Sequence, residues 1–239
     1  MSVSIDQQIA TARKQGLSIG IASGAYGISF GALSVAAGLD LWQTMGLSLL
    51  LFTGGSQFAL IGILGSGGNP VTAVATSTLL GIRNGLYGLQ TSRLLDLRGW
   101  RRAAAAHLTI DESAAISLAQ DEPAAQRAGF WAGGLGVFVF WNLATVLGAV
   151  LGNALGDPRT WGLDAAAAAA FVALIWPRLQ DRTGRVTAAL AAAIALISFV
   201  PTPAGVPVLL AAVAAVVVGL IDSSPSGAKD IEQPEGDLL

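Results

Sequence analysis

Two places in the sequence carry charged side chains inside or beside apolar segments, and these residues are the best candidates for chemistry. Arg83, followed by Asn84, interrupts the apolar run 70–92. Asp111 and Glu112 interrupt the mixed segment 103–120. Ionised groups are costly in lipid and are usually kept there for a function or a partner. We therefore expect a polar centre inside a membrane protein.

Arg83 has two interpretations. It can lie near a membrane edge and extend its guanidinium group to the headgroups. It can instead be a fixed cation that faces a cavity, where its paired donors suit the carboxylate of a substrate. In the second interpretation, Arg83 and Asn84 are candidate substrate-binding residues.

The carboxylates of Asp111 and Glu112 are also open to two interpretations. They can be solvated groups at the end of a surface helix. They can instead bind a substrate ammonium group or take up a coupling proton. His107 lies four residues before Asp111, so the two share a face if one helix carries both. His107 is then a candidate proton relay rather than a structural histidine, and it joins Asp111 and Glu112 as a candidate coupling residue.

A glycine-rich stretch at Thr53-Gly54-Gly55-Ser56-Gln57 is typical of a helix that stops and restarts. The free amide groups at the N-terminus of a half-helix attract a carboxylate, as in transporters with discontinuous helices. The alternative is a glycine face that packs against a neighbouring helix. Residues 54–57 are therefore candidate substrate-binding residues, whereas a stripe of small residues predicts helix packing at Gly20, Gly24, Gly27 and Gly31.

Enzymatic chemistry has little support in the sequence. The chain has no cysteine and one histidine, which excludes thiolate catalysis and leaves a single imidazole base. It has neither a phosphate-binding loop nor a nucleophile elbow. Its net charge of −2 provides no basic face for nucleic acid. We expect no catalytic residue, no metal site, no cofactor and no nucleic-acid partner.

The elements that position these residues are predicted to be membrane helices. Of the 239 residues, 53% are hydrophobic and 12% are charged, about half the charged share of a soluble protein. Runs long enough to span lipid must form helices, because each backbone amide has to be satisfied within its own segment. The predicted fold is an all-α integral membrane protein with about seven hydrophobic segments: 17–38, 42–64, 70–92, 129–152, 161–177, 186–200 and 204–221.

The distribution of positive charge sets the expected topology. We predict a cytoplasmic segment at 1–16, one polytopic domain at 17–221 and a disordered acidic tail at 222–239. Clusters of Lys and Arg at 13–14, 93–102 and 178–185 should all be cytoplasmic. Three apolar runs separate the first two clusters, which is an odd number of crossings. We therefore predict broken or re-entrant helices around 53–88, whereas segment 103–120 can lie on the surface, re-enter or cross.

Four segments in sequence order resemble the AzlC family. They are GISFGALSVAAGL at 27–39, FTGGSQFALIGIL at 52–64, GIRNGLYGL at 81–89 and LTIDESAAI at 108–116, within a resemblance that covers most of 19–177. The pair Gln57-Phe58 and the Arg83–Tyr87 spacing match the family pattern. The family's Thr-Asp-Glu string is altered, because Ile110 separates Thr109 from Asp111.

The resemblance implies a function. AzlC-type proteins are the large subunits of branched-chain amino-acid exporters that work with a small membrane protein, AzlD. It implies export of leucine, isoleucine and valine, with methionine as a further candidate, by a multi-pass protein of the bacterial inner membrane. We expect proton coupling, with Phe58 and Tyr87 receiving the aliphatic side chain. A passive pore and a non-catalytic subunit of a larger complex remain as alternatives.

Overall fold

The computed structural model describes residues 4–155, 160, 162, 165, 169, 172 and 175–221. Within these residues the chain is helical and contains no strand, which confirms the predicted all-α class. By length and composition, three described helical segments can cross a membrane: Ile5–Ala36, Pro123–Ala154 and Arg182–Phe199. The predicted segment at 161–177 lies largely outside the described residues, and the predicted tail at 222–239 lies wholly outside them.

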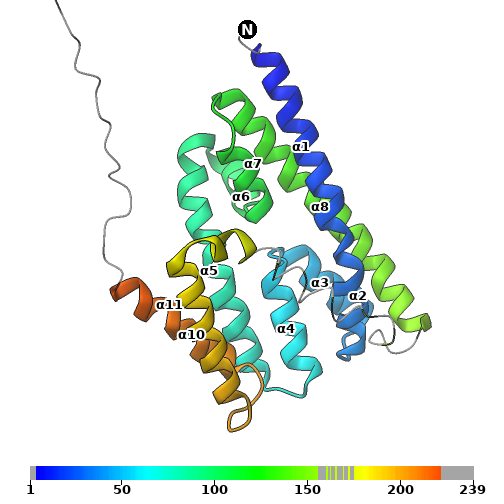
Figure 1. The fold of residues 1–239 in the computed structure, drawn as a ribbon. Helices are drawn as coiled ribbons and strands as arrows, with labels where there is room; N and C mark the ends of the chain where they lie inside the picture. Colours follow the sequence, from blue (N-terminus) through cyan, green and yellow to red (C-terminus); the bar gives the residue numbers. More distant parts are fainter. Residues whose placement is uncertain are drawn as a thin grey trace, which may run out of the picture.

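Three long helical rods form the main body of the protein (Figure 1). Helix α1 (Ile5–Ala25) continues almost directly into α2 (Gly27–Ala36), and this rod runs parallel to α8 (Pro123–Leu155). Helix α5 (Pro70–Leu95) has 26 residues, a length of about 39 Å at 1.5 Å per residue. Each rod is therefore longer than the hydrocarbon core of a bilayer, which is about 30 Å thick.

A hairpin of two short helices follows α2. Helix α3 (Leu41–Leu50) has 10 residues and α4 (Gly55–Gly65) has 11, so each is about 15 Å long and reaches only halfway through a bilayer. A Cβ added to Gly65, the last residue of α4, would lie 3.1 Å from the Cβ of Ala37, which follows the last residue of α2. The hairpin therefore enters and leaves on the same side, as a re-entrant element does.

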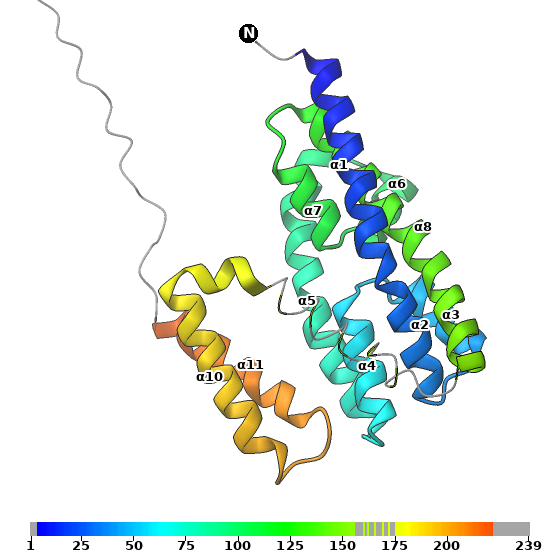
Figure 2. The same cartoon turned by 45° about the vertical axis from the view of Figure 1, so that its right-hand side comes forward.

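A second hairpin enters from the opposite end (Figure 2). It consists of α6 (Gly99–His107) and α7 (Asp111–Leu118), with 9 and 8 residues. The two hairpin tips meet, because the rings of Phe52 and His107 have centroids 6.0 Å apart. Of the three possibilities for segment 103–120, the structure has the re-entrant one. The condition under which His107 and Asp111 would share a helical face is not met, since residues 108–110 separate two helices.

The re-entrant hairpin removes the conflict in the charge distribution. The α1–α2 rod and α5 each run from one end of the helical bundle to the other, whereas α3 and α4 return to the end at which α3 begins, so the first two positive clusters lie at the same end (Figure 1). We call the shared end, with Arg13, Lys14, Arg93, Arg98 and Arg102, the arginine-rich end. The predicted interruption is confirmed at residues 51–54, but it was wrong at 81–85, where α5 is a continuous helix.

Small residues let the first rod approach α8 closely. A Cβ added to Gly20 would lie 2.8 Å from the backbone of Gly136, and one added to Gly27 would lie 2.5 Å from the carbonyl oxygen of Trp141. Close backbone approach is how helices associate in lipid, where burial of apolar surface gives no advantage. The predicted glycine stripe is therefore confirmed as a packing face within the chain.

The C-terminal part of the described chain is another helical hairpin. It consists of α10 (Arg182–Phe199) and α11 (Val206–Ile221), preceded by the 3₁₀ helix η2 (Trp176–Gln180). The turn between α10 and α11 contacts α5, where the Thr76 hydroxyl donates to the Gly205 carbonyl at 3.4 Å. Leu196 and Leu220 are each 75% exposed, as expected of side chains that face lipid.

Candidate functional site

Arg83 is the residue at which the two hairpins come together. It lies halfway along α5, thirteen residues after Pro70 and twelve before Leu95. Its Nη2 atom is 2.9 Å from Oδ2 of Asp111 in the second hairpin, and it donates to the carbonyl oxygen of Thr53 in the first hairpin at 3.3 Å. The guanidinium group of Arg83 is therefore bound inside the protein, between the tips of the two hairpins.

Glycine and glutamine shape the tip of the first hairpin. Gly54 has φ of 61° and ψ of −90°, a conformation that costs residues with a Cβ atom considerable strain. The fully buried Gln57 accepts from the Gly54 amide at 3.1 Å and donates to the Leu47 carbonyl at 3.2 Å. Both polar ends of Gln57 are thus engaged within the protein, and they hold the turn that starts α4.

The first turn of α4 is directed at α5. The hydroxyl of Ser56 is fully buried without a hydrogen-bond partner, and a Cβ added to Gly81 of α5 would lie 3.5 Å from it. The first amide groups of a helix, here those of Gly55 and Ser56, have no acceptor within the helix. The predicted residues 54–56 therefore lie beside the helix that carries Arg83, with donors available.

We call Arg83, Asp111 and the residues around their ion pair the Arg83 centre, and several of its buried polar atoms have no hydrogen-bond partner in the part of the chain that the structure describes. They include Nε of Arg83, Oδ1 of Asp111 and Oγ of Ser56. Native proteins satisfy nearly all such atoms, so a cluster of unsatisfied ones indicates a place where a polar ligand or water binds. Donors and acceptors occur together here, which suits a ligand that carries both kinds of group.

The tip of the second hairpin repeats the design of the first. Ser113 accepts from the Ile110 amide at 3.0 Å, as Gln57 accepts from Gly54. Thr109 and Ser113 follow Thr53 and Gln57 at the same spacing of 56 residues. The rod and hairpin of the first half, α1 to α4, run in the opposite direction to the rod and hairpin of the second half, α5 to α7 (Figure 1). The described chain therefore contains an inverted repeat. Transporters with inverted repeats place their binding sites at the repeat interface.

Glu112 adds a second carboxylate to the centre. It is half-buried, next to Asp111, within hydrogen-bonding range of the Ser23 side chain of α1 and close enough to Arg83 to interact with its charge. Both carboxylates lie in the first turn of α7, where the helix dipole stabilises negative charge. One guanidinium group and two carboxylates leave one negative charge, which a cationic ligand group or a proton can balance. Sequence reasoning did not find Ser23.

The two aromatic residues predicted to receive the aliphatic side chain, Phe58 and Tyr87, lie in different environments. Phe58 is buried in a cluster with Phe30 and Trp141, at ring distances of 5.9 and 6.0 Å. Tyr87 lies half-buried on α5, one turn after Arg83. The structure therefore puts Phe58 in the hydrophobic core and Tyr87 on the helix that carries the arginine. Their contact with an aliphatic substrate group stays a prediction.

His107 is exposed at the end of α6. Its ring packs against Phe52 and Phe138, with centroids 6.0 and 5.7 Å away. The helix break at 108–110 places it on a different helix from Asp111, so helical spacing no longer supports the proposed relay between them. A coupling role for His107 by another route stays a prediction.

The comparisons with known proteins agree with this picture. A family model described as AzlC protein matches residues 18–155, which contain both hairpins and Arg83. Two proteins from different strains of Helicobacter pylori, each described as an uncharacterized membrane protein, are 25% identical over 173 residues, or 72% of this chain and 75% of theirs. No solved structure matches the chain. The chain therefore belongs to the AzlC family, which is associated with branched-chain amino-acid transport and is not a family of enzymes.

Proposed function

We propose that this protein exports branched-chain and other apolar amino acids across the bacterial inner membrane. The observation that carries the proposal is the ion pair between Arg83 and Asp111, halfway along α5, where two re-entrant hairpins meet. Ion pairs at that depth mark substrate or ion pathways. A zwitterion supplies one group for each partner of this pair.

Arg83 and the start of α4 receive the substrate carboxylate. The guanidinium group forms strong, directional bonds to carboxylates, and the Nε atom of Arg83 has no hydrogen-bond partner among the described residues. The amides of Gly55 and Ser56 at the start of α4 add further donors, and helix N-termini bind anions in this way. Arg83 thus exchanges part of its contact with Asp111 for contact with the substrate.

The carboxylates receive the substrate ammonium group and provide the coupling to protons. Asp111 is held by Arg83, whereas Glu112 lies beside the pair and supplies the surplus negative charge. Export against a concentration gradient, driven by proton entry, is coupled directly when substrate and proton occupy the same group in turn. Glu112 fits that role best, because an ammonium group or a proton can each neutralise it. Asp111 takes part through its unpartnered Oδ1 atom.

The specificity of such a site is expected to be broad. Burial of a leucine-sized side chain contributes about 1.5–3 kcal/mol, and apolar pockets discriminate weakly between side chains that differ by one methylene group. Leucine, isoleucine and valine should therefore all be substrates, with methionine as a further one. Phe58 and Tyr87 are the proposed contacts for the aliphatic group.

The orientation follows from the charge distribution. The described residues at the end opposite the arginine-rich end, 36–41, 65–70 and 200–206, contain neither lysine nor arginine. The positive-inside rule therefore puts the arginine-rich end in the cytoplasm. The family resemblance supports a small AzlD-like membrane protein as a partner subunit.

Counterflow in proteoliposomes tests the proposal. Vesicles that contain the protein, with and without the small partner, are loaded with leucine and given labelled leucine under an imposed pH gradient. The wild-type protein and the Arg13→Ala control should accumulate label, whereas Arg83→Ala and Glu112→Gln should not. Counterflow that persists in both site variants would refute the assignment of the centre.

The same assay separates the alternatives. A passive pore equilibrates labelled leucine without accumulation and does not respond to the pH gradient. A non-catalytic subunit gives no counterflow without its partner and tolerates the loss of Arg83 or Asp111. The inverted repeat, which is typical of transporters that alternate between two open states, favours transport over both.

A further inference from the structure

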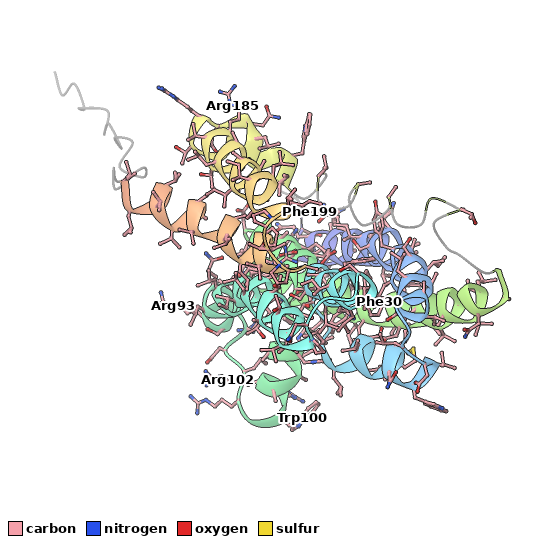
Figure 3. All side chains as sticks on the ribbon, turned by 90° about the horizontal axis from the view of Figure 1, so that it is seen from below. Phe30, Arg93, Trp100, Arg102, Arg185 and Phe199 are labelled. Carbon is pink, nitrogen blue, oxygen red and sulfur yellow. The ribbon has the colours of Figure 1, made fainter. Side chains whose placement is uncertain are left out.

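A groove between α5 and α6 runs from the arginine-rich end toward the Arg83 centre. It has a volume of about 570 Å³. Its mouth carries Arg93, Arg98, Arg102 and the single carboxylate Asp96, and its other end is lined by Asn84 and Thr109. We call it the α5–α6 groove. Figure 3 shows Arg93 and Arg102 on the same flank of the molecule.

Glycine keeps this groove wide. Gly85 and Gly88 line it from α5, and a Cβ added to either would have no atom within 4 Å. Neither glycine is needed for close packing or for a positive φ, although each costs about 1 kcal/mol relative to alanine in a helix. The facing wall on α6 is also built of small residues, Ala105 and Ala106. The glycines of α5 and the alanines of α6 therefore leave open space between the two helices, which explains why small residues stand at these positions.

The inner end of the groove lies next to the centre. Asn84 directly follows Arg83 in α5, and its Oδ1 atom is buried without a hydrogen-bond partner. Thr109 lies two residues before Asp111 at the tip of the second hairpin. The Arg83–Asp111 ion pair, and the hydrogen bond from Arg83 to the Thr53 carbonyl, therefore lie just beyond the end of the groove. A ligand that moves along the groove meets the Asn84 acceptor before it meets Arg83.

We propose that the α5–α6 groove is the water-filled path by which an α-amino acid reaches the Arg83 centre from the cytoplasm, with Asn84 as the first acceptor for its ammonium group. This inference rests on the proposed function. Three arginines and one aspartate give the mouth a positive charge that attracts a carboxylate. The volume is within the range of about 300–1,000 Å³ that is usual for small-molecule sites. The phosphate of a lipid headgroup shares the anionic chemistry, so the test has to separate the two.

Cysteine labelling tests the groove directly, since the native chain contains no cysteine. Gly88→Cys and Ala106→Cys place a thiol in the groove. Gly62→Cys is the control, because Gly62, like Gly88, is a helical glycine with open space around an added Cβ, but it lies on α4 and outside the groove. The full-length variants, in inverted membrane vesicles, are treated with a charged methanethiosulfonate that cannot cross the membrane. Because the hydrated thiolate attacks this reagent and displaces its sulfinate group, the groove thiols should react at least about tenfold faster than the control.

Leucine should protect the groove thiols, and the lipid composition should not matter. Transport of labelled leucine by the same variants is measured in parallel. Fast leucine transport without labelling of the groove would overturn this inference and leave the proposed function intact. Labelling that leucine does not slow, together with no leucine transport by the wild-type protein, would show that the proposed function itself fails. Protection by anionic lipid vesicles, but not by neutral ones, would assign the groove to a headgroup and overturn the inference.

Discussion

The ion pair between Arg83 and Asp111 can be measured through a double-mutant cycle of Arg83→Gln and Asp111→Asn. Loss of one partner of a buried pair costs about 3–5 kcal/mol because the other charge is left unpaired. The side chains of Arg83 and Asp111 are 24% and 18% exposed, so solvent screening reduces the cost to about 3 kcal/mol or less. The two single changes should differ in their effect.

The asymmetry follows from Glu112. Arg83→Gln leaves two carboxylates without a cation and should cost about 3 kcal/mol. Asp111→Asn leaves Arg83 beside Glu112 and should cost about 1–2 kcal/mol. The double variant has two neutral amides and should lose less than the sum of the two, with a coupling energy within the range of about 0.5–3 kcal/mol that is usual for residues in contact.

The assay is thermal unfolding in lipid nanodiscs, followed by the fluorescence of the six tryptophans. One kcal/mol corresponds to about 2–4 °C in Tm for a chain of this size, so Arg83→Gln should lower Tm by about 6–12 °C. Arg127→Gln is the control, because the side chain of Arg127 is exposed, forms no ion pair among the described residues and donates to the Leu94 carbonyl at 3.4 Å. The double variant should regain stability but not leucine transport. Strictly additive Tm shifts would show that the ion pair does not form in the folded protein.

Further expectations follow from the backbone and the topology. Gly54→Ala should lower Tm and reduce leucine transport, because alanine adopts the φ of 61° only under strain. Gly148→Ala should lower Tm because its Cβ would collide with a carbonyl of α2, whereas Gly46→Ala, with open space on α3, should keep or raise Tm; equal shifts would contradict the packing. In intact cells, Asp6→Cys and Trp100→Cys should both resist an impermeant thiol reagent, since two crossings separate them; labelling of only one would contradict the re-entrant hairpin.

The charged residues of the Arg83 centre could be predicted from the sequence, because ionised side chains are costly in lipid and therefore rare in apolar segments. Arg83, Asp111 and Glu112 were predicted as functional residues from their apolar surroundings alone, and the structure brings the three together. The interruption at residues 51–54 was predictable for a related reason, since two adjacent glycines stand among polar residues. The sequence could not show that the tips of the two re-entrant hairpins meet each other at Arg83. A contact between Arg83 and the carbonyl of Thr53 depends on the fold and not on the side chain at position 53.

The incorrect predictions have physical causes. The range 53–88 that was predicted to be broken includes Gly81 and Gly85 of α5, but in lipid the backbone keeps its internal hydrogen bonds and helices tolerate glycine. The hydropathy of segment 103–120 does not drop at residues 108–110, so the break between α6 and α7 could not be predicted from hydropathy. The repeat of Thr53 and Gln57 as Thr109 and Ser113 was the missed signal. A comparison of the two halves of the chain would have predicted a second hairpin.

The polar face of α5 has a consequence for biogenesis. Although α5 has 26 residues, it is not among the described helices that are apolar enough to cross by length and composition. An arginine at the middle of a helix costs about 2.5–3.5 kcal/mol on insertion scales for the translocon. The nascent α5 should therefore stay at the translocon until α7 emerges and supplies Asp111, so the order of synthesis delays the release of this helix into the bilayer.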